Sequence, residues 1–211
     1  MDVLEQIGRT RLVPVIALDR ADQAEPLGEA LVAGGLPVAE VTFRTAAAAE
    51  AIQVLSGDSH ILVGAGTVVS AAQVDVAVEA GARYIVSPGF SATVAQRCAE
   101  HGIPLLPGVA TATEVMMALD AGITTVKFFP AGTSGGAPAI KALSAPFPQV
   151  RFVPTGGISA ANLADYLAID AVLACGGSWM VPPKAINAGD FATITTLADE
   201  AVTLAAQLRG T

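Results

Sequence analysis

One lysine stands inside an apolar stretch, where a charged side chain is unusual. The stretch is TTVKFFPA, from Thr124 to Ala131, and its lysine is Lys127. Burial removes the water shell of an ammonium group and favours the neutral amine, which can attack a carbonyl group. The structural alternative is a buried salt bridge, which often stabilises a protein no better than apolar side chains would. Lys141 and Lys184 fit a polar helix face and a loop. Lys127 is therefore the candidate nucleophile.

A carboxylate and a guanidinium lie on another predicted strand, in the stretch VAEVTFRT. Side chains alternate between the faces of a strand, so Glu40, Thr42 and Arg44 share one face and the apolar residues between them share the other. Inside a barrel, Glu40 opposite a lysine would supply the pair that Schiff-base chemistry needs. Arg44 offers a planar fork for a carboxylate. The alternatives are a structural ion pair for Glu40, such as with Arg44, and a solvated surface arginine.

Glycines follow the last two predicted strands, in the stretches TGGIS (Thr155–Ser159) and CGGSW (Cys175–Trp179). Their backbone N–H groups can approach an anion, and the N-terminus of a following helix adds partial positive charge. Each pair alone is typical of a plain turn. Two pairs at consecutive strand ends, the second with Ser178, predict a phosphate site. Thr67, in the stretch GAGT, is predicted to donate a hydrogen bond to a substrate, and its alternative role is a helix N-cap.

The elements that position these residues are short β-rich runs alternating with amphipathic helical runs. The predicted strands are Val13–Leu18, Val38–Phe43, Ile61–Gly66, Arg83–Ser87, Pro104–Gly108, Thr125–Phe129, Arg151–Thr155 and Ala171–Cys175. Eight such units predict an α/β fold, a (β/α)₈ TIM barrel that forms a single compact domain over residues 1–211. A doubly wound open sheet is the alternative. The first strand lacks the Gly-x-Gly-x-x-Gly turn of its dinucleotide-binding version.

Barrel geometry separates the candidate site residues from other polar residues. Chemistry in these barrels occurs where strands end and helices begin. His60, His101 and Asp170 each precede a predicted strand. They are therefore predicted to lie on the opposite face, outside the site.

Composition limits the class of protein further. Hydrophobic residues make up 53% of the chain and charged residues 14%, which predicts a packed globule. The net charge of −8 argues against a nucleic-acid partner. No apolar stretch approaches the roughly 18 residues of a membrane span, and the first ten residues lack the features of a signal peptide, so a cytoplasmic protein is expected. Cys98 and Cys175 are expected to be reduced, small apolar fillers.

These residues together resemble the 2-keto-3-deoxy-6-phosphogluconate (KDPG) aldolases of the KHG/KDPG family. The similarity runs through most of the chain, in the stretches PVIAL, ALVAGGLPVAEVTFRT, VGAGTV, SPGF, PLLPGVAT, KFFPA, VRFVPTGGIS and GGSWMVP. The resemblance implies a class I aldolase with no metal and no cofactor, a small-molecule substrate, and a homotrimer of (β/α)₈ barrels.

By the same resemblance, Lys127 forms the Schiff base and Glu40 is the acid and base. The other implied residues are Arg44 and Thr67 for pyruvate, Pro88 and Phe129 as lining, and Gly156, Gly157, Gly177 and Ser178 for phosphate.

The resulting hypothesis is cleavage of 2-dehydro-3-deoxy-6-phosphogluconate to pyruvate and glyceraldehyde 3-phosphate. Relatives acting on the galactonate epimer tend to carry a basic residue just after the first strand; here Leu18 and Asp19 precede Arg20, which favours the gluconate. Family members also cleave 4-hydroxy-2-oxoglutarate to pyruvate and glyoxylate. Two alternatives remain open: a phosphosugar isomerase or synthase that forms no imine, and a non-catalytic phosphate-binding or assembly barrel in which Lys127 is only an ion-pair partner.

Overall fold

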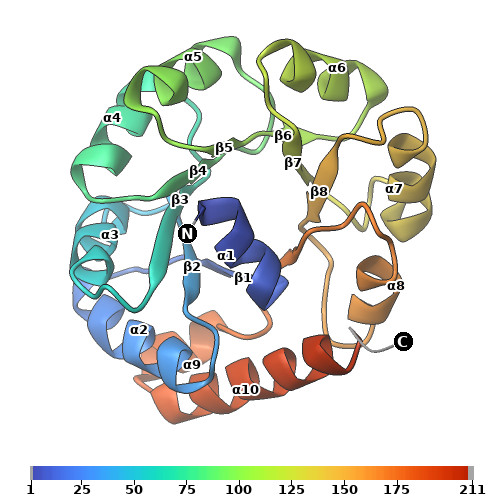
Figure 1. The fold of residues 1–211 in the computed structure, drawn as a ribbon. Coiled ribbons are helices and arrows are strands. Elements are labelled where there is room, and N and C mark those ends of the chain that lie inside the picture. The colour runs from blue at the N-terminus through green and yellow to red at the C-terminus, as the bar shows by residue number, and fades with distance from the viewer. Residues whose placement is uncertain (1, 209–211) are drawn as a thin grey trace.

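Parallel strands form a curled sheet in the middle of the molecule, and most helices surround it (Figure 1). The computed structural model describes residues 2–208. The strands are β1 (Leu12–Ile16), β2 (Val38–Thr42), β3 (Leu62–Gly66), β4 (Tyr84–Val86), β5 (Leu105–Leu106), β6 (Gly108–Val109), β7 (Thr125–Phe128), β8 (Arg151–Pro154) and β9 (Cys175–Gly177). The prediction of an α/β fold is confirmed. The domain predicted for residues 1–211 includes residues 1 and 209–211, which lie outside the described part.

The sheet has two parts. One has the order β5-β4-β3-β2-β1-β9 and the other has the order β6-β7-β8, with every pairing parallel. Isolated bridges between Phe152 and Val172 and between Thr155 and Gly176 link the two parts on one side. On the other side, Pro107 separates β5 from β6.

The helices follow the strands in alternation. They are α1 (Val3–Thr10), α2 (Ala24–Ala33) after the short 3₁₀ helix η1 (Ala21–Gln23), α3 (Ala48–Ser56), α4 (Ala71–Glu79), α5 (Ala92–His101), α6 (Ala112–Asp120), α7 (Gly136–Ser144), α8 (Leu163–Leu167), α9 (Pro183–Ala188) and α10 (Phe191–Gln207). Side-chain caps begin several of them: Ser70 accepts a hydrogen bond from Gln73 N, and Ser91 and Thr111 do the same for α5 and α6.

Two of the predicted strands are wrong in their bounds. The predicted fifth strand, 104–108, is divided at Pro107, because proline has no N–H to donate to a neighbouring strand. In the predicted eighth strand, 171–175, only Val172 forms an isolated β-bridge before Cys175, and the observed β9 is Cys175–Gly177. Its glycines have no side chain, so Thr155 and Trp179 lie directly against their backbone, and the strand propensity of this segment is weak.

Helix α1 was not among the predicted helices, and it lies across one end of the curled sheet (Figure 1). Val3 and Ile7 point from it into a buried cluster with Ala174, which precedes β9, and with side chains from the strands, namely Val13, Val38, Leu62, Tyr84, Val86, Leu106 and Val153. This inner cluster is separate from the larger one between the strands and the surrounding helices, which contains Ala39 and Val41. The split confirms the predicted alternation along β2, with Val38 facing inward.

The positions of the two cysteines and the hydropathy of the helices agree with what the composition predicts. Cys98 and Cys175 are free and buried, and burial raises the pKa of their thiols to about 11 and about 12. Within residues 2–208, no helix has both the length and the apolar character needed to cross a membrane.

Candidate active site

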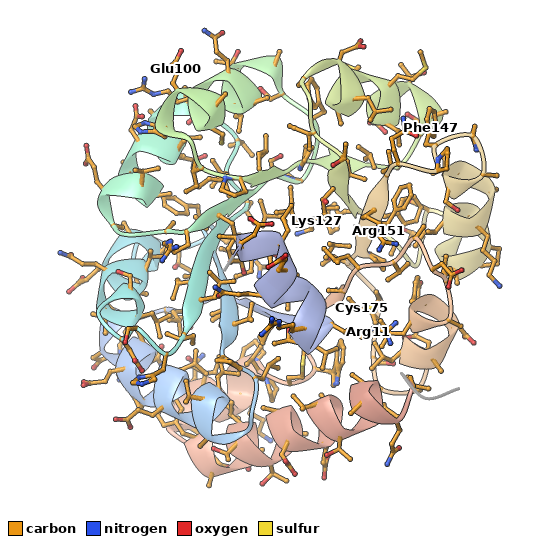
Figure 2. The ribbon with its side chains drawn as sticks, in the orientation of Figure 1. Arg11, Glu100, Lys127, Phe147, Arg151 and Cys175 are labelled. Atoms are coloured by element: carbon orange, nitrogen blue, oxygen red, sulfur yellow. The ribbon has the colours of Figure 1, made fainter. Side chains whose placement is uncertain are left out.

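A buried ion pair lies inside the curled sheet. Nζ of Lys127 on β7 donates to Oε1 of Glu40 on β2 over 3.1 Å, and the two residues are 6% and 3% exposed. Figure 2 shows Lys127 pointing into the interior of the ring of helices. The structure thus brings together the two residues predicted to carry the chemistry. The alternative in which Glu40 pairs with Arg44 does not occur.

Two glycines of β3 make room for the Glu40 side chain and for a tyrosine side chain below it. The carboxyl group of Glu40 lies against the Cα of Gly66, where a Cβ atom would overlap it. One layer deeper, the ring of Tyr84 covers Gly64 in the same way, and its hydroxyl group donates to Ala39 O over 2.8 Å. Burial, and then the charge of Glu40, raise the pKa of Tyr84 well above its usual value. A neutral phenol therefore lies below the carboxylate.

Sequence reasoning missed Tyr84, although a signal existed. Gly64 and Gly66 alternate along β3 and so share one face. Two glycines on the inner face of one strand indicate that large side chains from neighbouring strands cross over it. Here Tyr84 and Glu40 are those side chains.

The predicted pyruvate-binding residues lie just beyond the carboxyl ends of the strands. Arg44 follows β2 and is exposed, and its Nε donates to Oγ1 of Thr42 over 3.0 Å. Thr67 follows β3 with a φ of 58°, a left-handed conformation that is rare for threonine. Ser70, and not Thr67, caps α4, so the alternative role of Thr67 as an N-cap is wrong. Strained residues of this kind often mark functional sites.

The two predicted lining residues border the same region. The Phe129 ring centroid lies 5.3 Å from Lys127 Nζ, within the range of a cation–π contact. Pro88 is exposed after β4, and its carbonyl group lies against the backbone of Gly108, where any side chain would collide with it. Both residues therefore stand at the end of the sheet at which Arg44 and Thr67 are found.

The two glycine stretches are neighbours in space. Thr155 and Gly176 pair in a parallel bridge, and the buried Thr155 side chain lies over Gly176. Gly156 and Gly157 have φ values of 95° and 79°, which suit glycine alone. Gly177 is buried under the Trp179 ring inside β9, and Ser178 beyond it is exposed.

One part of the phosphate prediction, the contribution of helix N-termini, is not supported by the structure. Each stretch was expected to lead toward a helix whose N-terminus adds partial positive charge, but α8 begins only at Leu163 and has five residues, and α9 begins at Pro183. Five residues separate Gly157 from α8, and five separate Gly177 from α9. Any anion there would depend on backbone N–H groups and Ser178, without a helix dipole.

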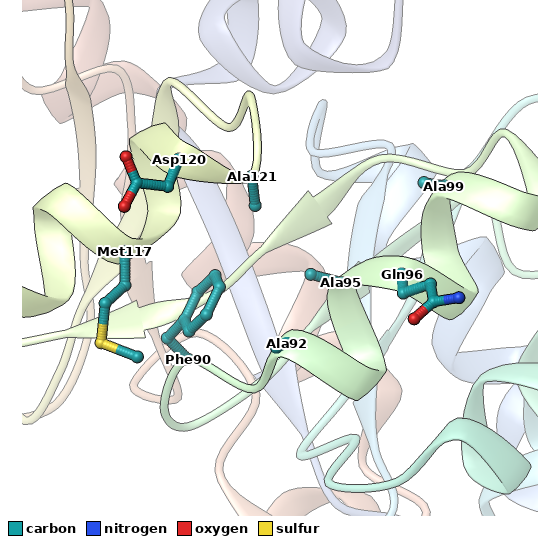
Figure 3. A pocket seen from close by; sticks show the side chains of 8 residues that line it. All are labelled: Phe90, Ala92, Ala95, Gln96, Ala99, Met117, Asp120 and Ala121. Atoms are coloured by element: carbon teal, nitrogen blue, oxygen red, sulfur yellow. The ribbon is translucent and has the colours of Figure 1, made fainter.

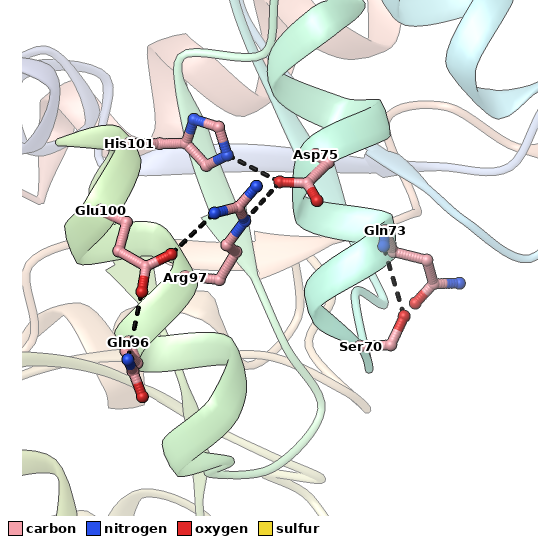
Figure 4. A network of polar contacts seen from close by, with 7 residues as sticks. All are labelled: Ser70, Gln73, Asp75, Gln96, Arg97, Glu100 and His101. Carbon is pink, nitrogen blue, oxygen red and sulfur yellow. Dashed lines mark hydrogen bonds and ion pairs between the residues drawn. The ribbon is translucent and has the colours of Figure 1, made fainter.

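The polar residues predicted to lie outside the site are found there. His60 contacts Asp58 in an exposed turn before β3, and the Asp170 carbonyl accepts a hydrogen bond from Arg151 before β9. His101 lies 2.7 Å from Asp75, which also accepts a 2.6 Å bond from Arg97 (Figure 4). This network joins α4 to α5 on the outside of the molecule.

A groove of about 470 Å³ lies between α5 and α6 (Figure 3). Its lining consists of Phe90, Gln96, Met117 and Asp120 together with alanine side chains. It shares no residue with the predicted site, so its size does not mark the place of the chemistry.

The chain resembles known proteins over most of its length. A sequence profile for the family described as KDPG and KHG aldolase matches residues 3–197. The 2-dehydro-3-deoxy-phosphogluconate aldolase of Treponema pallidum (strain Nichols) is 50% identical over 199 residues, which make up 94% of this chain and 95% of that protein.

Two crystal structures are similar over nearly the whole chain. The KDPG aldolase of Zymomonas mobilis ZM4, solved with 3-phosphoglycerate, has a TM-score of 0.90 and 44% identity, with 95% of each chain covered. That of Legionella pneumophila, with pyruvate captured at low pH as a covalent carbinolamine intermediate, has a TM-score of 0.91 and 41% identity, covering 95% of this chain and 98% of that one. The chain therefore belongs to the KDPG and KHG aldolase family.

Proposed function

We propose that this protein is a class I aldolase that cleaves 2-dehydro-3-deoxy-6-phosphogluconate to pyruvate and glyceraldehyde 3-phosphate. The observation that carries the proposal is the buried contact of 3.1 Å between Lys127 and Glu40. A carboxylate at this distance can take the proton of the ammonium group and leave the neutral amine that attacks a ketone. The T. pallidum relative bears the name of this aldolase, and the L. pneumophila structure holds pyruvate as a carbinolamine.

The first half of the reaction joins the substrate to the enzyme. Neutral Lys127 Nζ attacks C2 of the keto acid, and the carbonyl oxygen takes up a proton to give a carbinolamine. Loss of water, with a proton from Glu40, gives the protonated imine. Arg44 and Thr67, at the ends of β2 and β3, hold the substrate carboxylate. The planar guanidinium of Arg44 matches the shape of a carboxylate. Pro88 and Phe129 line the site.

The second half breaks the carbon–carbon bond. Glu40 takes the proton of the C4 hydroxyl group, the C3–C4 bond breaks, and its electron pair enters the imine to form an enamine. The C4 oxygen becomes the aldehyde of glyceraldehyde 3-phosphate, which leaves. Glu40 then returns its proton to C3, and water hydrolyses the imine to release pyruvate and free Lys127. One carboxylate thus serves as base and then as acid.

The phosphate group belongs at the two glycine stretches, because they lie side by side beyond β8 and β9. Gly156, Gly157, Gly177 and Ser178 form this part of the proposed site. Within the described residues, the N–H groups of Gly157 and Ser178 donate to no other atom of the chain, and both remain available to an anion.

We propose the gluconate as the main substrate and 4-hydroxy-2-oxoglutarate as a second one. The family description names both activities. After β1, Arg20 pairs with Asp22 over 2.9 Å, and both side chains are about 70% exposed. The paired guanidinium adds little net positive charge near the site, in keeping with the gluconate rather than the galactonate epimer.

Two structural proposals accompany the function. The two parts of the sheet are proposed to act as one closed (β/α)₈ barrel, which the bridges from β8 to the β9 segment support. A homotrimer is proposed from the family resemblance. Met116 and Met117, which are 56% and 43% exposed on α6, are candidate contact residues. Light scattering of the purified protein tests the trimer, and the mass of a single chain would contradict it.

Trapping with borohydride tests the proposed chemistry. The protein is incubated with pyruvate, reduced with borohydride and digested, and the modified peptide is identified by mass spectrometry. An aldolase of this class gives a permanent adduct on Lys127 and releases glyceraldehyde 3-phosphate from the gluconate. An unmodified protein would favour an isomerase, a synthase or a binding protein instead.

A further inference from the structure

The side chain of Asn162 spans the loop that follows β8. Asn162 occupies the N-cap position of α8, where an asparagine usually accepts a hydrogen bond from the first turn of the helix. Here it forms no such cap. Its Oδ1 instead accepts from Ser159 N over 2.9 Å, and its Nδ2 donates to Gly157 O over 2.9 Å. The residue therefore fixes the loop and leaves the helix end without a side-chain cap.

The Gly157 carbonyl is the last of three consecutive carbonyls in this loop that are held by the protein. Thr155 O accepts from Ala131 N over 2.8 Å and Gly156 O accepts from Gly132 N over 2.9 Å. Those two bonds come from the backbone of the segment after β7. The third bond comes from a side chain, and so it alone depends on the identity of a residue.

A hydrogen bond that fixes the direction of a carbonyl group also fixes the direction of the N–H group in the same peptide unit. The C=O and N–H of a trans peptide unit point in opposite directions. With Gly157 O held by Asn162, the N–H of Ile158 in the same peptide unit points away from Asn162. With Gly156 O held by Gly132, the N–H of Gly157 points away from the segment after β7. Both glycines have positive φ values, at which the loop would otherwise have much conformational freedom.

We propose that Asn162 is a positioning residue for the phosphate end of the substrate. It orients the Gly157–Ile158 peptide unit so that the backbone N–H groups of the loop meet the phosphate oxygens. The inference rests on the proposed function, because it assumes that this loop receives a phosphate. Asn162 acts through the backbone and does not itself contact the substrate.

The test compares two substrates of the same enzyme. In Asn162→Asp the shape of the side chain is kept, but the donor to Gly157 O is replaced by a carboxylate oxygen. We expect kcat/KM for 2-dehydro-3-deoxy-6-phosphogluconate to fall roughly ten- to hundredfold, mainly through KM, as for a lost bond to a charged group. For 4-hydroxy-2-oxoglutarate, which has no phosphate, kcat/KM should stay within about twofold. Inorganic phosphate should likewise inhibit the variant less than the wild type.

A matched control separates the lost bond from the added charge. Ala161 is exposed next to Asn162, and Ala161→Asp adds the same charge while it leaves both bonds of Asn162 in place. This control should retain the wild-type preference between the substrates at physiological salt. Asn162→Ala, which has no new charge, should behave like Asn162→Asp. Equal losses with both substrates, or no loss with either, would overturn the inference.

A separate adduct experiment tests the proposed function itself. Pyruvate and borohydride are applied first to the wild type and to Asn162→Asp. Adducts on Lys127 in both proteins keep the aldolase proposal, whatever the phosphate result is. A wild type without an adduct would reject the proposed function itself, and the inference about Asn162, which rests on that function, would be overturned with it.

Discussion

Lys127 and Glu40 are 87 positions apart in the sequence, yet each is the other's ion-pair partner inside the sheet. They belong to strands of different parts of the sheet, β7 and β2. Removing one partner of a buried pair leaves the other charge without compensation, which typically costs about 3–5 kcal/mol. Substitutions that test the chemistry must therefore be judged for stability as well as for activity.

Lys127→Arg keeps the positive charge for Glu40 but removes the nucleophilic amine. We expect kcat to fall at least about 1,000-fold, as for other removed nucleophiles, and the pyruvate adduct to disappear. The larger guanidinium group should lower the free energy of unfolding by about 1–3 kcal/mol. Lys141→Arg on α7 is the matched control and should keep both activity and adduct. Steady-state kinetics and circular dichroism provide the measurements, and substantial turnover by Lys127→Arg would contradict the mechanism.

Glu40→Gln keeps the size of the side chain but removes the acid and base. Cleavage should slow by roughly 10²- to 10⁴-fold. Exchange of the methyl protons of pyruvate, followed by NMR in deuterated water, should slow with it. Glu50, which is exposed on α3, is the control, and Glu50→Gln should leave exchange unchanged. Exchange at the wild-type rate in Glu40→Gln would remove Glu40 from the mechanism.

Gly66→Ala tests the position of Glu40. The new Cβ would overlap the carboxyl group of Glu40, and the carboxylate must move away from Lys127. A displacement of about 1 Å can cost on the order of 100-fold in rate, so we expect a loss of that size. Gly57→Ala at the end of α3 is the control, because its φ is −66° and the closest atom to its new Cβ lies 3.3 Å away. Equal activity in the two variants would show that Glu40 tolerates the shift.

The network on Asp75 predicts a pH dependence of stability. Hydrogen bonds from Arg97, and then from His101, hold the pKa of Asp75 below its ordinary value of 3.8. A lowered folded-state pKa means that this stabilisation is complete above the unfolded-state pKa and is lost as the pH falls through the folded-state pKa. Asp75→Asn should therefore lower the melting temperature at pH 7, and its difference from the wild type should shrink below about pH 4.

The control for that prediction is Asp199→Asn, an exposed residue on α10. It should change the melting temperature little at either pH. Because the network lies outside the proposed site, kcat/KM of Asp75→Asn at pH 7 should equal that of the wild type. A melting difference that is the same at pH 3 and pH 7 would contradict the assigned ion pairs.

Ile7 tests the contribution of α1. Its side chain is fully buried in the inner cluster. Ile7→Ala should lower the free energy of unfolding by about 2–5 kcal/mol and Ile7→Val by about 0.5–1.5 kcal/mol. Val54→Ala on α3, where the side chain is 41% exposed, should cost far less. Urea unfolding measures all three, and a negligible effect of Ile7→Ala would mean that α1 is not needed in the folded state.

The alternation of side chains along two strands was enough to predict that Glu40 and Lys127 share the interior. The pattern works because one face of each strand is apolar and the other carries the rare polar residues. Their pairing is a different matter: no local pattern joins β2 to β7, and only the curvature of the whole sheet brings them to 3.1 Å.

Local sequence patterns could not predict strand β9 or the hydrogen bonds of Asn162, for physical reasons. Cys175–Gly177 forms a strand because β1 pairs with it on one side and Thr155 bridges to Gly176 on the other; glycine itself has little strand preference. Asn162 looks like an ordinary helix cap in the sequence, and its backward bonds depend on the course of the loop. By contrast, the division at Pro107 and the apolar spacing of Val3 and Ile7 are signals that the sequence itself carries.

Among the described residues, Val3 and Ile7 of α1 fill the amino-terminal end of the interior. The opposite end of the strands, where Arg44, Thr67 and Ser178 stand, is therefore the end at which a substrate would enter and leave. In the proposed mechanism the fragment bonded to Lys127 lies deepest, so the aldehyde must leave before pyruvate can, and slow departure of the aldehyde would delay the next turnover.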